Sequence, residues 1–317
     1  MKKILVICGP TATGKTGLGL KLAKKFNGEI ISADSRQIYK GMNIATGKDI
    51  GQGRWLKDHW EIEKIPVWLL DIVEPNVEFS VAHYADLAWG KIKDIWQRGK
   101  LPIIVGGTGF YIKAVIENIP SRGISPDWSL RKKLESKPVE FLFEELAKLD
   151  SFRAGQMNTS DRKNKRRLIR AIEIARWQVT NRLPEKEKLP VFETLFIGLK
   201  ASFKFLYQQI DQRVELHFKM GAKKEITELL KNGFSWNLPS MSAMGYQEWQ
   251  PFFEKKADLS QVLSHWKFNE HAYARRQMTW FKKDKRIKWF DISQKGLENG
   301  VEKEVFIWYI KDNAKKD

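Results

Sequence analysis

Cysteine is nearly absent from this sequence, since Cys8 is the only one among 317 residues. A single thiol cannot close an intrachain disulfide or build a cysteine-rich zinc site, so we expect no bound zinc. One unpaired cysteine in a chain of this length is typical of a protein kept in a reducing compartment, and the sequence therefore predicts a cytoplasmic location.

Long apolar runs are absent as well. No segment contains the roughly 20 consecutive apolar residues that a membrane-spanning helix requires. The apolar run after Lys3 is short, is interrupted by Gly9 and Pro10, and has no signal-peptide cleavage site after it. We therefore expect a protein that is neither exported nor embedded in a membrane.

Acidic residues are scarce relative to basic ones: 38 Asp and Glu stand against 56 Lys and Arg, which gives a formal charge of +18 and a pI near 9.7. Such an excess attracts phosphates and polyanions. It does not distinguish nucleic acid from an anionic membrane surface or a small phosphorylated substrate. The hydrophobic content of 42% is enough for a buried core, which argues against a disordered chain.

Short apolar runs alternate with helical patterns along much of the chain, as expected for a parallel sheet with crossover helices. The predicted strands are Ile4–Cys8, Glu29–Ala33, Val67–Ile72, Pro102–Val105 and Leu195–Leu199, and the predicted helices include Thr16–Phe26, Ala82–Arg98, Lys204–Asn232 and Asp258–Lys283. The fold class is therefore α/β, with a three-layer α/β/α core.

Strand signals stop in the middle of the sequence, where helical segments rich in Arg and Lys replace them. This change predicts a helical insertion domain at residues 117–192. The core then consists of residues 1–116 and 193–317.

One motif gives the core its chemistry. Gly9-Pro10-Thr11-Ala12-Thr13-Gly14-Lys15-Thr16 matches GxxxxGK[ST] and lies between a predicted strand and a predicted helix, as in P-loop NTPase-like folds. Backbone N–H groups of such a loop surround phosphate oxygens, Lys15 adds a charge, and Thr16 is the expected ligand for Mg²⁺. ATP is the usual occupant, so the motif alone favours nucleotide binding by a kinase or an NTPase.

The segment after the second predicted strand, Ser32–Met42, resembles the tRNA dimethylallyltransferase family, also called tRNA isopentenyltransferase or IPP transferase. Further blocks resemble motifs of that family in the same order. They are Gly106–Tyr111, Arg166–Glu173, Asp211–Val214, Met244–Tyr246 and Ala274–Phe281. The resemblance therefore extends over most of the chain.

The resemblance implies a reaction. The loop would hold the diphosphate of dimethylallyl diphosphate with the help of Mg²⁺, and the N6 amine of adenosine 37, next to the anticodon of a tRNA, would attack the allylic carbon. Asp34 is implied as the general base, and Thr11 and Arg213 as groups that stabilise the departing diphosphate. Asp34 follows a predicted strand, at the edge where open α/β sheets bind ligands. A turn or helix-cap role fits its sequence context equally well.

The resemblance also implies tRNA contacts. It places Asp34, Ser35, Arg36, Gln37 and Thr108 around the target nucleotide, and it assigns Arg166, Arg167, Leu168, Ile169 and Arg170 to the tRNA. The cations of this second stretch outnumber the acids nearby, which favours a phosphate partner, although a charged helix is often only solvated. A later cluster that begins with Arg275 and Arg276 is interleaved with aromatic residues on which unstacked bases could lie.

The sequence departs from the family pattern near the third predicted strand. Val67-Trp68 replaces a common histidine pair, and Lys48-Asp49 replaces a common Lys-Pro. Asp71, at the end of that strand, is a candidate to support the metal site or to cap a loop. Neither departure removes an implied catalytic residue.

Two other functions stay open from the residues alone: a P-loop kinase for a small molecule, and an RNA-binding module controlled by a nucleotide. The kinase leaves the arginine-rich insertion unexplained. The binding module does not need Asp34 beside the loop. We therefore expect the transferase, acting as a monomer.

Overall fold

The computed structural model describes residues 1–117, 124, 126–181 and 189–311. The chain divides into two compact units: unit 1 comprises Met1–Glu117 and Pro190–Asp317, and unit 2 comprises Asn118–Leu189. Among the helices in the described ranges, none combines the length and the apolar content needed to span a lipid bilayer.

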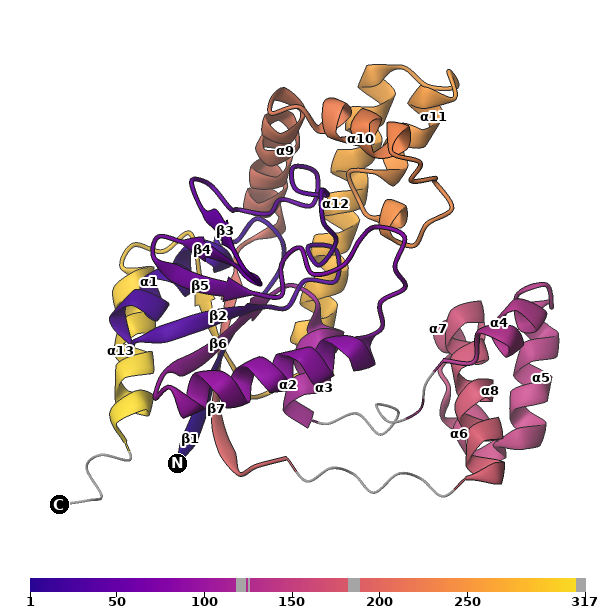
Figure 1. Ribbon diagram of the computed structural model, residues 1–317, viewed down its shortest axis with the longest axis horizontal. Helices are drawn as coiled ribbons and strands as arrows, with labels where there is room; N and C mark the ends of the chain where they lie inside the picture. The colour runs from indigo at the N-terminus through magenta and orange to yellow at the C-terminus, as the bar shows by residue number, and fades with distance from the viewer. Residues whose placement is uncertain (118–123, 125, 182–188, 312–317) are drawn as a thin grey trace. The chain divides into compact units, whose positions relative to one another are not determined.

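An eight-stranded sheet forms the centre of unit 1 (Figure 1). Its strands lie in the order β3 (Arg54–Leu56), β4 (His59–Ile62), β5 (Ile65–Trp68), β2 (Gly28–Ser32), β6 (Leu101–Gly106), β1 (Lys2–Cys8), β7 (Phe192–Lys200) and β8 (Ile287–Asp291). All neighbours from β5 to β8 are parallel. The sheet is therefore an α/β sheet of the predicted class.

The β3–β4–β5 edge of the sheet differs from the prediction because its strands pair antiparallel. β3, β4 and β8 were not predicted, since each has at most five residues and is only partly buried. The strand expected at Val67–Ile72 ends at Trp68. Leu69 and Asp71 have φ values of 66° and 52°, which no β-strand accommodates.

Helices cover both faces of the sheet (Figure 1). α1 (Lys15–Lys25) and α13 (Leu297–Ile310) pack with Leu5 and Ile7 of β1 in one hydrophobic cluster. α2 (Val81–Gln97) and α3 (Gly109–Glu117) lie on the other side. Because successive side chains of a strand point to opposite faces, β1 must be apolar throughout, as it is from Ile4 to Cys8.

A helical layer lies beyond the carboxyl ends of the parallel strands (Figure 1). It contains α9 (Phe203–Lys219), α10 (Ala222–Lys231), α11 (Gln250–Phe253) and α12 (Leu259–Phe281), with the short 3-10 helices Ser240–Ser242 and Gln247–Trp249. The single helix predicted at Lys204–Asn232 is two helices, because Gly221 takes a φ of +105° between them. A second hydrophobic cluster packs this layer against Ile38 and Met42.

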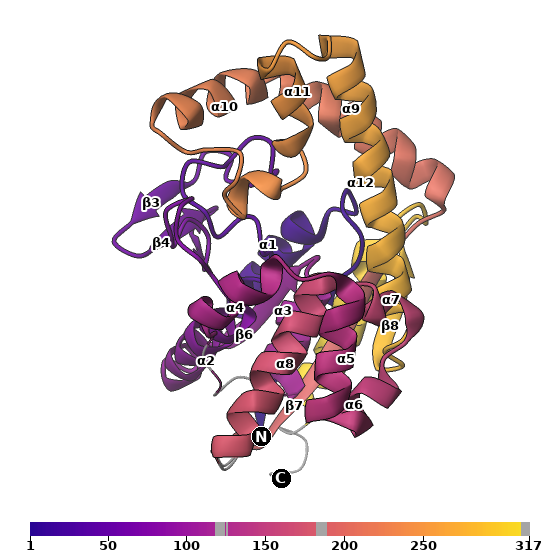
Figure 2. The same cartoon turned by 90° about the vertical axis from the view of Figure 1, so that its right-hand side faces the viewer.

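Unit 2 consists of helices α4 (Trp128–Glu135), α5 (Val139–Leu149), α6 (Ser151–Gln156), α7 (Thr159–Arg162) and α8 (Lys165–Thr180). α5 lies alongside α8 (Figure 2). Leu142 and Leu146 of α5 pack with Leu168 and Ile172 of α8 in a hydrophobic cluster of their own. Unit 2 therefore has its own buried core.

Candidate active site

The phosphate loop lies between β1 and α1, as the motif predicts. Gly9 has a φ of +137°, and a Cβ there would lie 2.4 Å from the carbonyl oxygen of Leu199. Gly14 has a φ of +75° and precedes the first turn of α1, which contains no acidic residue. These two positions therefore require glycine, and the start of α1 leaves positive charge available for an anion.

Lys15 bends back over this loop. Its Nζ donates to the carbonyl oxygen of Pro10 at 2.5 Å, and the hydroxyl of Thr13 donates to the same oxygen at 2.9 Å. Burial, with a further contribution from Arg213, lowers the pKa of Lys15 to about 8. The ammonium is thus charged at neutral pH, and its hydrogen-bond acceptor is a neutral carbonyl and not an acid. Such a group is suited to bind a phosphate.

Arg213 of α9 reaches the phosphate loop from a distant part of the chain. Its Nη1 donates to Oγ1 of Thr11 at 2.8 Å, and its Nη2 donates to the carbonyl oxygen of Gly47 at 3.2 Å. Both acceptors are neutral, so these hydrogen bonds orient the guanidinium without cancelling its charge. Two cations, Lys15 and Arg213, are therefore brought to the same loop.

Asp34 follows β2 at the carboxyl edge of the sheet. Its Oδ1 accepts a hydrogen bond from the backbone N–H of Arg36 at 2.9 Å, so the side chain does form a turn. No other hydrogen bond to Asp34 occurs within the described ranges. The second carboxylate oxygen is thus uncommitted, and the turn role and a catalytic role are compatible.

These groups line a single cavity of about 1070 Å³ in unit 1. Thr11–Thr16 of the loop, Asp34, and Arg213 all face it. Apolar side chains share its wall, among them Ile44, Leu216, Met220 and Met244. The cavity therefore joins an anion-binding end, a carboxylate and an apolar surface, which suits a donor with a phosphate head and a hydrocarbon tail.

No three His, Cys, Asp or Glu side chains of the described chain come together as a ready-made metal site. Thr16, however, lines the cavity at the start of α1. Mg²⁺ in phosphate-transfer sites keeps several waters and binds one or two protein oxygens together with substrate phosphates. The residues present therefore fit a cation that is held mainly by the substrate.

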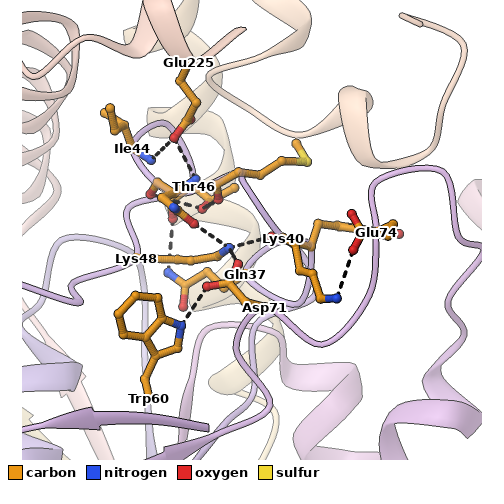
Figure 3. A network of polar contacts seen from close by, with 12 residues as sticks. Gln37, Lys40, Ile44, Thr46, Lys48, Trp60, Asp71, Glu74 and Glu225 are labelled. Atoms are coloured by element: carbon orange, nitrogen blue, oxygen red, sulfur yellow. Dashed lines mark hydrogen bonds and ion pairs between the residues drawn. The ribbon is translucent and has the colours of Figure 1, made fainter. Parts of the chain in front are cut away.

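The loop Asn43–Lys48 forms another part of the cavity wall, and a network of polar contacts holds it (Figure 3). The buried ammonium of Lys48 donates to the carbonyl oxygen of Tyr39 at 2.5 Å and pairs with Asp71. Trp60 Nε1 donates to the other oxygen of Asp71 at 2.8 Å. Asp71 is thus a loop anchor, which was one of its two expected roles.

Glu225 of α10 holds the same loop from the other side (Figure 3). Its Oε2 accepts from the backbone N–H groups of Asn43 and Ile44 at 2.9 and 2.8 Å. Gln37 donates from Nε2 to the carbonyl oxygens of Thr46 and Gly47 at 3.1 and 2.9 Å. The acceptor that Arg213 uses, the Gly47 carbonyl, is therefore fixed in place.

Comparison with known proteins identifies this arrangement. A model of the IPP transferase family matches residues 37–284, and a model described as isopentenyl transferase matches residues 2–54. The tRNA dimethylallyltransferase of Pelotomaculum thermopropionicum is 40% identical over 295 residues, 91% of this chain and 90% of the relative. That of Roseiflexus sp. strain RS-1 is 39% identical over 290 residues, 89% of this chain and 91% of the relative.

The chain belongs to the IPP transferase family.

Solved structures agree. The crystal structure of the full-length tRNA isopentenylpyrophosphate transferase from Bacillus halodurans is 34% identical, with a TM-score of 0.71, and covers 100% of this chain and 99% of its own. A eukaryotic dimethylallyltransferase acting on tRNA is 26% identical, with a TM-score of 0.79, over 99% of this chain and 80% of its own. The family predicted from the ordered motifs is confirmed.

The residues that the family resemblance places around the target nucleotide lie at the cavity or beside it. Asp34, Ser35, Arg36 and Gln37 line it, whereas Thr108 accepts a hydrogen bond from the backbone N–H of Ser35 at 3.1 Å. Arg36 donates to the carbonyl oxygen of Pro239 at 2.7 Å. Arg276 lines the cavity, while its neighbour Arg275 turns to the Tyr207 hydroxyl at 2.5 Å.

The family's arginine-rich block lies on α8 of unit 2, and its members differ. The side chains of Leu168 and Ile169 are buried in the hydrophobic cluster, so in this structure they are not accessible to a tRNA. Arg167 pairs with Asp161, and Arg170 donates to Glu173 at 3.0 Å. The excess of cations in this stretch favoured a phosphate partner, but much of this positive charge is paired with acidic residues of the same unit.

Several residues of this IPP transferase site were not singled out by the sequence. They are Gln277 and Glu270, which line the cavity, and Glu225 at the loop. Within unit 2, Glu173, which pairs with Arg131, was not singled out either. Burial raises the pKa of Glu270 to about 7. Gln277 lies within the block Ala274–Phe281 and Glu173 within the block Arg166–Glu173. The blocks do not show which groups these side chains contact, because Gln277, for example, bonds to Thr11 and Gly107, far away in the sequence.

Proposed function

We propose that this protein transfers a dimethylallyl group from dimethylallyl diphosphate to the N6 amine of adenosine 37, beside the anticodon of tRNA. The observation that carries the proposal is the meeting of the phosphate loop, Arg213 and Asp34 in one cavity. Relatives that share about 40% of their residues with this chain are named for the same reaction.

The diphosphate of the donor would lie against the backbone N–H groups of residues 9–16, with Lys15 and Arg213 as its cations. As the C–O bond to the allylic carbon breaks, negative charge collects on the diphosphate. Cations that are already oriented stabilise that charge without having to reorganise, which is an effective way to lower a barrier. Thr11 contributes by holding Arg213 at the loop.

The adenosine amine would approach from the side of Asp34. A new N–C bond forms at the allylic carbon, the C–O bond breaks, diphosphate leaves, and the amine loses one proton. The free oxygen of Asp34 is suited to accept that proton, which contributes about 10²- to 10⁴-fold when the base is well placed.

Mg²⁺ would bind at the Thr16 hydroxyl together with oxygens of the donor. When bound, it would neutralise charge on the diphosphate. Thr16 is placed to orient the ion because it lies at the start of α1, next to Lys15. We propose no zinc and a monomeric, cytoplasmic enzyme, in keeping with the single buried cysteine.

The tRNA would meet several exposed cations. Arg276 lines the cavity, where the target nucleotide would enter. In unit 2, Arg166 is exposed and makes no ion pair within the described part of that unit. Arg167 and Arg170 are each paired with an acidic residue, so each should contribute less to phosphate binding than Arg166.

An assay with purified protein, Mg²⁺, unmodified tRNA and labelled dimethylallyl diphosphate tests the proposal, with ATP added to a parallel reaction. We expect a prenylated adenosine without ATP. Turnover of ATP without prenyl transfer would instead support the kinase or the nucleotide-controlled RNA-binding module.

A further inference from the structure

Gln277 lies on α12 and is 5% exposed. Its side chain makes two hydrogen bonds, both to backbone groups. Oε1 accepts from the N–H of Thr11 at 2.8 Å, and Nε2 donates to the carbonyl oxygen of Gly107 at 3.0 Å. The amide thus uses one acceptor and one donor to join the phosphate loop to the segment that follows β6.

The Gly107 end of this bridge continues towards Asp34. The backbone N–H of Thr108 donates to the carbonyl oxygen of Ala33 at 3.1 Å, and Thr108 Oγ1 accepts from the N–H of Ser35 at 3.1 Å. Ala33 and Ser35 are the two neighbours of Asp34. A connected set of contacts therefore runs from the third residue of the phosphate loop to both sides of the proposed base.

The sequence of the bridged segment fits this contact closely. A Cβ at Gly107 would lie 2.2 Å from Gln277 Nε2, and a Cβ at Gly109 would lie 2.1 Å from Trp280 Nε1. A side chain at either position would displace Gln277 or Trp280 from its present place. Gln277 and Trp280 are three residues apart and so lie on one side of α12, which rests directly on this backbone.

We infer that Gln277 is a positioning residue that sets the distance between the donor, held by the phosphate loop, and the acceptor amine, held by Asp34. The inference rests on the proposed transferase function. Transfer needs the amine and the allylic carbon within about 3 to 3.5 Å of each other, and a displacement near 1 Å can cost roughly 100-fold in rate. Gln277 acts on the reaction through the two segments that it joins.

The first test replaces Gln277 with Met, which keeps the length of the side chain but removes both hydrogen bonds. We expect kcat to fall by roughly 10- to 100-fold, because donor and acceptor are no longer aligned. The KM for each substrate should change by less than about threefold, since the groups that bind each one remain. A kcat equal to that of the wild type would overturn the inference.

Met278→Leu is the matched control for packing. Met278 is buried on the same helix, next to Gln277, and its side chain makes no hydrogen bond within the described residues. Its replacement should lower the melting temperature without lowering kcat. If Met278→Leu reduced kcat as much as Gln277→Met, the loss would be one of packing, and the inference would fail.

Gln277→Glu gives a readout that a purely structural role would not move. A neutral carboxyl has one oxygen that accepts and one O–H that donates, so it reproduces both hydrogen bonds, whereas a carboxylate can only accept and repels the Gly107 carbonyl. Burial should raise the pKa of the introduced carboxyl towards neutrality. The variant should therefore recover activity as the pH falls.

The measurement is the ratio of kcat for Gln277→Glu to kcat for the wild type between pH 6 and pH 8.5. The other ionisable groups of the cavity are Lys15 and Asp49 near the phosphate loop, Asp34 and Arg36 after β2, Lys48, Arg213 and His217, and Glu270, Tyr273 and Arg276 on α12. They are present in both proteins, so the ratio largely cancels their titration.

We expect this ratio to rise about tenfold from pH 8.5 to pH 6 as the carboxyl takes up its proton. A ratio that does not change with pH would overturn the role of the bridge. A wild-type protein that transfers no prenyl group at any pH would instead overturn the proposed function, so the two failures can be told apart.

Discussion

Arginines from the two units of this protein have opposite surroundings. In unit 1, the hydrogen bonds of Arg213 to other described residues go to a hydroxyl and a carbonyl, and its charge faces a cavity. In unit 2, Arg170 donates to Glu173, which also pairs with Arg131 at 2.6 Å. Arg213 therefore keeps its charge available for an incoming anion, whereas the charge of Arg170 is partly neutralised by Glu173 of the same helix.

The carboxylates differ in the same way. Glu173 is 3% exposed, and Arg131 and Arg170 lower its pKa despite its burial. Asp34 faces the cavity and accepts only one backbone hydrogen bond within the described residues. In this protein, a charged side chain that faces a cavity without forming an ion pair to a described residue therefore marks the candidate active site better than a high density of charge along the sequence does.

The largest effect should come from Asp34, which forms no ion pair with any residue that the structure describes. Asp34→Ala should lower turnover by roughly 10²- to 10⁴-fold, because the amine loses its proton acceptor. Donor and tRNA affinities, measured by equilibrium binding, should change little. Asp34→Asn is the matched control, since its amide oxygen can still accept from the N–H of Arg36. Normal turnover in Asp34→Asn would exclude Asp34 as the base.

Removing the unneutralised arginine should come next. Arg213→Met should lower kcat by roughly 10²- to 10³-fold, because the departing diphosphate loses an oriented cation. Single-turnover kinetics with labelled donor measures the effect. Gln212→Met, at the exposed neighbouring position, should leave the rate unchanged. Equal rates for Arg213→Met and the wild type would place the leaving group elsewhere.

The lowered pKa of Lys15 predicts a smaller, pH-dependent effect. In the free protein this lysine loses its proton as the pH rises through about 8, whereas a bound diphosphate would keep it protonated. Donor affinity should therefore be constant below pH 7.5 and weaken by up to about tenfold per pH unit above 8. Calorimetric titration at several pH values should also detect proton uptake on binding. A flat profile to pH 9.5 would contradict the shift.

The smallest effects on activity should come from two arginines of α8, and the two substitutions should change different properties. Arg166→Ala should reduce the slope of log affinity for tRNA against log salt by roughly 0.7 to 0.9, the loss of one phosphate contact. Arg170→Ala should instead lower the free energy of unfolding by about 1 to 3 kcal/mol, because Glu173 loses a partner. Salt titrations and thermal melts on both variants check this. The opposite pattern would move the tRNA surface to Arg170.

The core of the fold could be predicted because its signals are local. The apolar run Ile4–Cys8, followed by the glycine-rich loop and an amphipathic helix, encodes a strand, a phosphate loop and a helix within a few turns of chain. The same reasoning missed β3 and β4, which are short and at most partly buried; β4 pairs with β5, and β3 pairs with β4. It also extended β5 too far, because nothing local marks the positive φ of Leu69.

The sequence by itself determined the family, the phosphate loop with Lys15 and Thr16, and the candidacy of Asp34 and Arg213, since motifs carry that information. Only the tertiary structure decided which charges are paired and which are available. Arg213 meets Thr11 across 202 positions of sequence, and Gln277 meets it across 266. Contacts over such separations depend on how the sheet and helices pack, and no local pattern of residues encodes them.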